Sequence, residues 1–196
     1  MARISFKLPA DVEDEQCREW LEKAIATGKP GPEFQAIRAH SRGVMQSFSR
    51  TREWIYHDGV VDFDLKELVR AYIALSGDCT YCSNQGVARA INADNEQRQA
   101  LLSYQQSDQY TDRQKLVFRF ADAIMWNPAE VDDEMWAELL GEFTEEQVVE
   151  LGYWIGFTFG GQRFLKTLGA TQGQLQEALA AAANDLSVCS AATASD

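Results

Sequence analysis

Hydrophobic residues recur at helical spacing along most of the chain. A first apolar stripe follows Pro9 and ends before Gly28 and Pro30; its members are Val12, Cys17, Trp20, Leu21, Ala24 and Ile25, with acidic residues opposite them. The next stretch, residues 34–56, has the same period, and we expect it to break near Ser41-Arg42-Gly43. The pattern therefore predicts consecutive amphipathic helices.

Polar residues mark where further helices begin and end. Asp62 is placed to cap a helix that Ser76-Gly77 ends, and Asp78 is then expected to cap the next one. Capping boxes are predicted at Thr111/Gln114, Thr144/Gln147 and Thr171/Gln174. Asn127-Pro128 should close one helix, while Asp132 or Asp133 should open a short one that ends at Gly141. No segment alternates as a strand does, so the fold class is all-α.

The length of 196 residues suits one domain, which we place at residues 1–186, and the small polar residues 187–196 are expected to be disordered. A weak similarity relates positions 83 residues apart. Glu67-Leu68, Gly77 and Gly86 match Glu150-Leu151, Gly160 and Gly169, which predicts two weakly similar helical halves.

The chain is acidic, with 30 Asp and Glu against 18 Lys and Arg and a formal charge of -12. This charge repels phosphate backbones and anionic lipid, so neither nucleic acid nor a membrane surface is an expected partner. The longest apolar stretch, residues 151–161, is much shorter than the roughly 20 residues that cross a bilayer. The start of the chain does not resemble a signal peptide, and we expect a cytoplasmic protein.

Cys79-Thr80-Tyr81-Cys82 is the clearest candidate for chemistry. Cysteines at i and i+3 lie on one side of a helix and can interconvert between a dithiol and a disulfide. A zinc site would need a second ligand cluster, which the sequence lacks, so we expect neither a metal nor an organic cofactor. The thiol needs a proton acceptor, and Glu67 on the preceding helix is the nearest strong candidate. Its place on an apolar stripe predicts a raised pKa.

The segment from Glu67 to Ala90, ELVRAYIALSGDCTYCSNQGVARA, resembles the alkylhydroperoxidase D-like group of the carboxymuconolactone decarboxylase superfamily, as do FADAIMWNPAEV and ELGYWIGFTFGGQRFLKTLG. The resemblance extends over about residues 34–168. It implies an all-helical orthogonal bundle and a homo-oligomer, either a dimer, a trimer or a hexamer. It also implies that Cys82 attacks a hydroperoxide, that Cys79 resolves the product and that Glu67 takes the proton. The histidine of the family pattern is absent, because its position is Gly86.

Several assignments stay open at this stage. The helix terminus favours Cys79 as the more acidic thiol, whereas the resemblance implies attack by Cys82. Gln85 is an accessory candidate that could orient a water molecule, and Tyr81 is one that could donate a hydrogen bond. The leading hypothesis is a peroxidase or disulfide oxidoreductase that acts on a small hydroperoxide and is reset by an external dithiol or thiol protein. The alternatives are a cofactor-free lyase or isomerase and a non-catalytic oligomer whose site has decayed.

Other polar and aromatic residues have simpler interpretations. His40 and His57 are expected to be structural or solvated, and Arg163 is expected to pair with an acid such as Glu150. An aromatic cluster late in the chain is expected to be core or subunit interface; it consists of Tyr153, Trp154, Phe157, Phe159 and Phe164.

Overall fold

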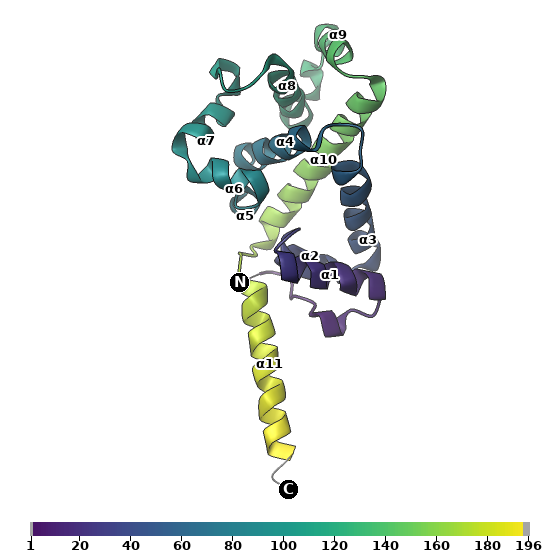
Figure 1. The fold of residues 1–196 in the computed structure, drawn as a ribbon, viewed down its shortest axis with the longest axis vertical. Helices are drawn as coiled ribbons and strands as arrows, with labels where there is room; N and C mark the ends of the chain where they lie inside the picture. The colour runs from purple at the N-terminus through teal and green to yellow at the C-terminus, as the bar shows by residue number, and fades with distance from the viewer. Residues whose placement is uncertain (1, 194–196) are drawn as a thin grey trace. The chain divides into compact units, whose positions relative to one another are not determined.

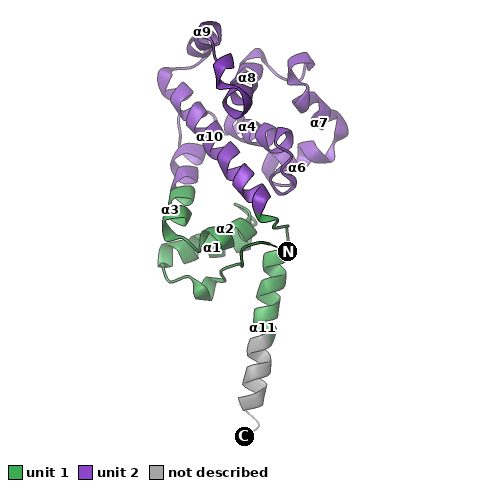
Figure 2. Ribbon diagram, turned by 180° about the vertical axis from the view of Figure 1, so that it is seen from behind, with its two compact units in different colours: residues 1–49, 168–196 green, residues 50–167 purple. Residues whose placement is uncertain are grey.

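A computed structural model describes the backbone of residues 2–193 and the side chains of residues 2–184. The chain divides into two compact units, residues 1–49 with 168–196 and residues 50–167 (Figure 2). The single domain over residues 1–186 stays a prediction. The predicted disorder concerns residues 187–196, whose side chains are not among those described.

The first unit consists of helices around a small apolar core. It contains a 3₁₀ turn at Pro9–Asp11, α1 (Glu15–Thr27), α2 (Pro32–Arg38), most of α3 (Arg42–Thr51) and α11 (Gln174–Thr193). The carboxylate of Asp14 caps α1 by accepting the Cys17 N–H, and Gly28 ends the helix with a φ of 70°. The chain turns between α2 and α3, which confirms the break expected near Ser41.

The second unit is also helical throughout. A π-helical turn, Arg52–His57, precedes α4 (Phe63–Ser76), α5 (Thr80–Ser83), α6 (Gly86–Ala93) and α7 (Asn95–Leu102). A 3₁₀ turn at Tyr104–Gln106 leads to α8 (Asp112–Trp126), and a second one at Pro128–Glu130 leads to α9 (Asp133–Glu142) and α10 (Glu145–Leu168). No strand occurs in residues 2–193, so the all-α prediction is confirmed.

Helix α4 lies in the middle of the second unit, with α5 and α6 at its C-terminal end and α8 and α10 beside it (Figure 1). Its Val69 and Ile73 are fully buried together with Phe118 of α8 and Leu151 and Ile155 of α10. Burial of such side chains contributes roughly 1.5–3 kcal/mol each, so α4 is the element on which the unit is assembled.

The predicted helix ends are mostly present. Thr111 and Gln114 bond each other's backbone N–H at 3.2 and 2.9 Å, and the Thr144/Gln147 pair does so at 3.2 and 3.1 Å. The third box shows its Gln half, because the Gln174 side chain accepts the Thr171 N–H at 3.1 Å.

The start of α5 differs from the prediction. Its N-cap is Cys79 and not Asp78. Asp78 has a φ of 51°, and its carboxylate accepts a hydrogen bond from the Lys166 ammonium at 3.1 Å. The carboxylate is therefore directed to α10 and away from the first turn of α5.

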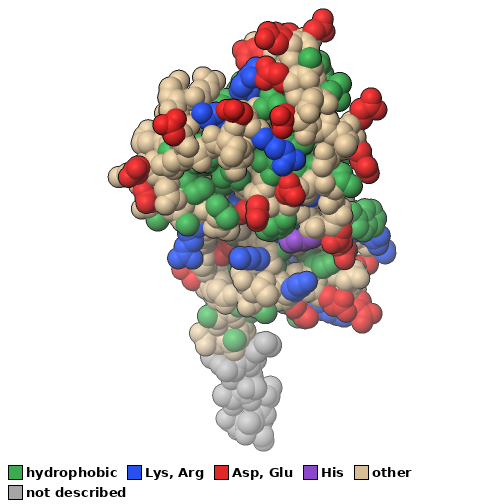
Figure 3. Space-filling model, turned by 45° about the horizontal axis from the view of Figure 1, so that its top comes forward, with side chains coloured by type: hydrophobic (Ala, Val, Ile, Leu, Met, Phe, Trp, Pro, Cys, Tyr) green, Lys and Arg blue, Asp and Glu red, His purple; other side chains and the backbone are tan. Residues whose placement is uncertain are grey.

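Charged side chains of both signs are scattered over the face of the molecule shown in Figure 3, among polar and apolar ones. Within the described residues, no helix combines the length and the apolar character needed to cross a bilayer.

Candidate redox site

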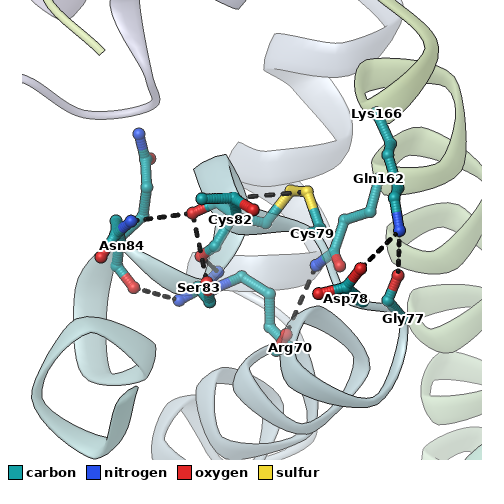
Figure 4. Close-up of a disulfide and its surroundings, with 11 residues drawn as sticks. Arg70, Gly77, Asp78, Cys79, Cys82, Ser83, Asn84, Gln162 and Lys166 are labelled. Atoms are coloured by element: carbon teal, nitrogen blue, oxygen red, sulfur yellow. Dashed lines mark hydrogen bonds and ion pairs between the residues drawn. A yellow bond between two sulfur atoms is a disulfide. The ribbon is translucent and has the colours of Figure 1, made fainter. Parts of the chain in front are cut away.

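Cys79 and Cys82 form a disulfide at the end of α4, with their Cα atoms 5.2 Å apart (Figure 4). Both residues are buried, and they pack with Ala74 of α4 and Leu165 of α10. The Cys79 sulfur also accepts the backbone N–H of Cys82 at 3.4 Å. The expected thiol pair is thus present in its oxidised form, inside the second unit.

A tight reversal after α4 places the pair. The N–H of Gly77 bonds the carbonyl of Ile73 at 3.0 Å, and that of Cys79 bonds the carbonyl of Ala74 at 2.9 Å. The Lys166 ammonium donates to the Gly77 carbonyl at 3.4 Å, which ties the reversal to α10 (Figure 4). The cysteines therefore lie against the last turn of α4 and one face of α10.

Glu67 is buried and accepts four hydrogen bonds. Its Oε2 accepts from Arg70 Nε at 2.6 Å and from the Tyr56 hydroxyl, and its Oε1 accepts from Arg70 Nη2 at 2.7 Å and from the Val87 N–H at 2.9 Å. A carboxylate has about four acceptor positions, so those of Glu67 are filled.

The raised pKa expected for Glu67 is wrong. Burial alone would raise the pKa of this carboxyl, but the hydrogen bonds and the charge of Arg70 lower it, as do the bonds from Tyr56 and Val87, and the net pKa lies below its usual value. The sequence pattern showed the burial but not the donors that converge on the charged form. Glu67 is thus ionised at neutral pH and a weaker base than expected.

Arg70 connects Glu67 to the cysteine motif. Besides the two bonds to Glu67, its guanidinium donates to the Gln85 carbonyl at 2.8 Å and to the Cys82 carbonyl at 3.4 Å. Sequence reasoning did not single out this residue, although its place three residues after Glu67 is the spacing at which side chains meet on a helix. Through Arg70, Glu67 and the CxxC segment share one hydrogen-bonded network.

Gly86 occupies the place of the missing histidine, and its surroundings leave no room for a side chain. Its φ is +55°, and a Cβ atom built there would lie 2.1 Å from Glu67 Oε1 and 2.9 Å from Arg70 Nη2. The carboxylate and the guanidinium fill the space beside the backbone at this position. Glycine at residue 86 and the Glu67–Arg70 pair are therefore structurally linked.

Tyr56 and Arg52 complete the polar cluster on the other side of Glu67. The Tyr56 ring stacks on Trp154 with centroids 4.7 Å apart, and the Arg52 guanidinium lies 4.5 Å above the Tyr56 ring. Burial raises the pKa of the Tyr56 hydroxyl, and the neighbouring Glu67 carboxylate raises it further. Tyr56 is thus a neutral donor to Glu67. Nothing in the sequence pattern pointed to this role.

Of the two accessory candidates, Gln85 has a contact in the network, and the role of Tyr81 stays a prediction. Gln85 enters the network through its backbone carbonyl and stands at the N-cap of α6, while Tyr81 is a partly buried residue of α5. Arg163 does not pair with Glu150. Its guanidinium lies 4.9 Å from the Trp126 ring centre and 5.0 Å from that of Phe159, and Glu150 pairs with Lys66.

His57 contacts the Tyr56 ring, with centroids 4.8 Å apart, whereas His40 belongs to the first unit. A ring nitrogen of His40 is 2.8 Å from the Ser5 carbonyl oxygen, and the His57 ring stacks on Phe63. Among the side chains of residues 2–184, no three His, Cys, Asp or Glu residues are grouped as metal ligands would be.

Three solved structures share this fold. An alkylhydroperoxidase AhpD core, described as an uncharacterized peroxidase-related protein from Ralstonia eutropha, matches 87% of this chain and 91% of its own at 18% identity, with a TM-score of 0.68. An uncharacterized peroxidase-related protein from Silicibacter sp. matches the same shares at 14% identity and a TM-score of 0.70. A protein of unknown function from Agrobacterium tumefaciens matches 76% of this chain and 94% of its own at 13% identity and a TM-score of 0.56.

These similarities define the fold. The chain has the all-helical fold of the AhpD core, as its resemblance to the alkylhydroperoxidase D-like group implied. No protein-family model matches the sequence, and no curated protein matches it. At identities of 13–18% the shared fold carries no activity with it, so function is argued from the site.

Proposed function

We propose that this protein is a thiol-dependent peroxidase, a disulfide oxidoreductase that reduces small hydroperoxides through Cys79 and Cys82. The observation that carries the proposal is the Cys79–Cys82 disulfide, joined through Arg70 to a buried, ionised Glu67 on an AhpD-like fold. A pair that closes within one helical turn can store and release two electrons. No metal or organic cofactor is part of the proposal, because the sulfurs themselves carry the electrons.

The proposed cycle has three steps. The Cys82 thiolate attacks the terminal oxygen of the hydroperoxide, the O–O bond breaks, and the alkoxide leaves and takes a proton as an alcohol. The Cys82 sulfenic acid then condenses with the Cys79 thiol, which forms the disulfide and releases water. An external dithiol or thiol protein reduces the disulfide and is itself oxidised to a disulfide.

Glu67 is the proposed acceptor of the thiol proton. All four of its acceptor positions are filled in the oxidised protein, so it must release one donor before it can bind a proton. The Tyr56 hydroxyl is its only uncharged side-chain donor, and releasing it disrupts neither the Arg70 ion pair nor the Val87 bond. We therefore propose that Tyr56 moves away from Glu67 when the thiol is deprotonated.

The choice of Cys82 as the attacking residue follows the family resemblance. The bond from the Cys82 N–H to the Cys79 sulfur instead favours Cys79 as the more acidic thiol. We retain Cys82 as the nucleophile and Cys79 as the resolving residue in the proposal. Site-resolved alkylation of the reduced protein distinguishes the two assignments, because the more acidic thiol reacts first as the pH rises.

The proposal also includes the setting of the reaction. We propose a homo-oligomer in the cytoplasm, where thiol reductants are available. Large apolar side chains at its surface support an interface between copies, since Trp126, Tyr153 and Phe164 are each half exposed.

Peroxide consumption tests the proposal. The reduced wild-type protein with excess dithiol is compared with Cys82→Ser and Glu67→Gln, with circular dichroism as a check on folding. We expect turnover by the wild type, none by Cys82→Ser and a rate at least tenfold lower for Glu67→Gln, because a general base contributes about 10²–10⁴-fold. Equal rates in all three folded proteins would reject the function.

A second candidate is a structural disulfide in a non-catalytic protein. It is favoured by the burial of both sulfurs and by the filled acceptor positions of Glu67. In that event the reduced thiols of Cys79 and Cys82 would react with iodoacetamide no faster than free cysteine between about pH 6 and pH 9, given the usual thiol pKa of about 8.5.

A further inference from the structure

One face of α10 carries a row of side chains along α4 and the disulfide. Trp154, Thr158, Gln162 and Leu165 are spaced by four, four and three residues and so lie on the same side of the helix. The Trp154 indole donates to the Lys66 carbonyl at 3.0 Å, the Gln162 amide donates to the Arg70 carbonyl at 3.4 Å, and Leu165 packs against the cysteines. Gln162 therefore lies one turn from the contact with the disulfide.

The amide oxygen of Gln162 is buried without a hydrogen-bond partner among the described residues. Gln162 is 9% exposed, and its Oε1 is one of few side-chain atoms in this condition. Its orientation is fixed, because a flipped amide would place Oε1 against the Arg70 carbonyl oxygen. In Figure 4 this amide lies on the Cys79 side of the disulfide. A buried acceptor without a donor costs about 1–3 kcal/mol, so a donor is expected in another state of the protein.

Reduction of the disulfide supplies such a donor. A disulfide has no proton on sulfur, whereas each thiol of the reduced pair has an S–H group. Cys79 and Cys82 are 3% and 5% exposed, so these groups have little access to water. The thiols are donors with little access to water, and Gln162 Oε1 is an acceptor without a donor. A hydrogen bond between them is possible only in the reduced protein.

We propose that Gln162 is a positioning residue for the redox pair, whose Oε1 accepts a hydrogen bond from the Cys79 thiol in the reduced form only. The inference rests on the proposed redox use of the pair. The bond stabilises the dithiol relative to the disulfide and holds the resolving thiol against α10 until Cys82 has reacted. The bond from Gln162 to the Arg70 carbonyl exists already in the oxidised form and fixes the acceptor in advance.

Equilibration with glutathione tests this role. The disulfide and two glutathione thiols exchange two electrons and two protons to give the dithiol and one glutathione disulfide, and the ratio of the forms gives an equilibrium constant. Gln162→Leu and Gln162→Met both remove the oxygen acceptor. We expect either substitution to shift the constant about fivefold towards the disulfide, or about 20 mV, because a net hydrogen bond contributes about 1 kcal/mol.

Thr158→Val is the matched control. Thr158 lies on the same face of α10, is buried, and has a hydroxyl without a hydrogen-bond partner among the described residues, but it lies one turn further from the cysteines. Its substitution should leave the constant unchanged within twofold. A purely structural role of Gln162 would alter both redox forms equally and would not move the constant.

The outcomes separate this inference from the proposed function, since no peroxide is used. A shift in both Gln162 variants with none in Thr158→Val supports the inference even in a protein that consumes no peroxide. No shift in the Gln162 variants, an equal shift in Thr158→Val, or a disulfide that glutathione reduces only on unfolding would each overturn it.

Discussion

At residue 86 the backbone and its neighbours both require glycine. A non-glycine residue at a φ of +55° costs about 1–2 kcal/mol, and the Glu67 carboxylate occupies the position of a Cβ atom. Any side chain there has to displace Glu67 or move the start of α6. Glycine at this position is thus coupled to the closed Glu67–Arg70 pair.

Gly86→Ala should destabilise the protein by at least about 2 kcal/mol, the sum of backbone strain and displacement of the carboxylate. Gly156→Ala is the control. Nothing lies within 4 Å of a Cβ at Gly156, so within α10 this change should stabilise by about 0.5–1 kcal/mol. Urea unfolding measures both, and equal stability of Gly86→Ala and the wild type would contradict the assigned geometry.

Tyr56→Phe tests whether Glu67 is the proton acceptor. Loss of the hydroxyl removes a donor from the ionised carboxylate, so the pKa of Glu67 should rise towards its usual value and one acceptor position should open. Peroxide consumption at neutral pH should then be kept or raised, by less than about tenfold for one hydrogen bond. A loss of rate as large as that of Glu67→Gln would show that Tyr56 itself is needed in the proton transfer.

Among the elements, α6 is capped at its N-terminus by a carboxylate from another helix. Gln85 occupies the N-cap without a side-chain bond, and Glu67 of α4 accepts the Val87 N–H in its place. This bond joins the first half of α4 to the start of α6. A negative charge at a helix start is favourable, so the ionised form of Glu67 stabilises the joint.

The pH dependence of stability follows from this bond. Because the pKa of Glu67 is lowered in the folded protein, its contribution is present above the unfolded pKa of about 4.3 and is lost as the pH falls towards the folded value. The free energy of unfolding should fall from about pH 5 to pH 3, and less steeply in Glu67→Gln. An unchanged slope in Glu67→Gln would refute the assigned ionisation.

Helix ends could be predicted from the sequence where the signal is local. Thr111 with Gln114 and the Asn127-Pro128 stop are read from neighbouring residues, and the structure has both. The start of α5 could not be predicted in this way, because the Asp78 carboxylate pairs with Lys166, a residue 88 positions away. At the start of α5, therefore, a long-range partner made the prediction wrong.

At the scale of the whole second unit, a buried ion pair joins α4 to α10. Lys66 is fully buried and bonds Glu150 at 2.8 Å as well as the Ile55 carbonyl, and Glu150 also accepts the N–H groups of Val60 and Val61. Glu67 and Glu150, which correspond in the weak internal similarity, thus both pair with a cation and accept backbone N–H groups. The duplication itself stays a prediction.

Lys66→Ala should destabilise the protein by about 3–5 kcal/mol, because it leaves a carboxylate in a partly buried place without its cation. Arg119→Ala is the comparison, since the Arg119–Glu138 pair is about two-fifths exposed on each side and should contribute less than about 1 kcal/mol. Thermal and urea unfolding give the two values. Similar small losses in both variants would contradict the importance of the buried pair.

The site could be predicted from the sequence only as a set of residue types. The spacing of Glu67, Cys79 and Cys82 predicted a shared site, and the structure links Glu67 to the cysteine motif through Arg70. The state of Glu67 could not be read in the same way, since Tyr56 comes from an earlier element and Val87 contributes a backbone group. Arg52 and Tyr56 join the cluster through a tertiary arrangement that no local pattern records, whereas Arg70 follows Glu67 at the i+3 spacing of one helix.

A single-turnover titration with mass-spectrometric thiol mapping probes the redox pair directly. The reduced protein receives one equivalent of hydroperoxide without oxygen, and each cysteine is then assigned as thiol or disulfide. We predict that one peroxide is consumed per chain, that Cys79 and Cys82 become a disulfide, and that Cys82→Ser consumes none. If the folded wild-type protein keeps both thiols while the peroxide remains, the pair does not carry the proposed reaction.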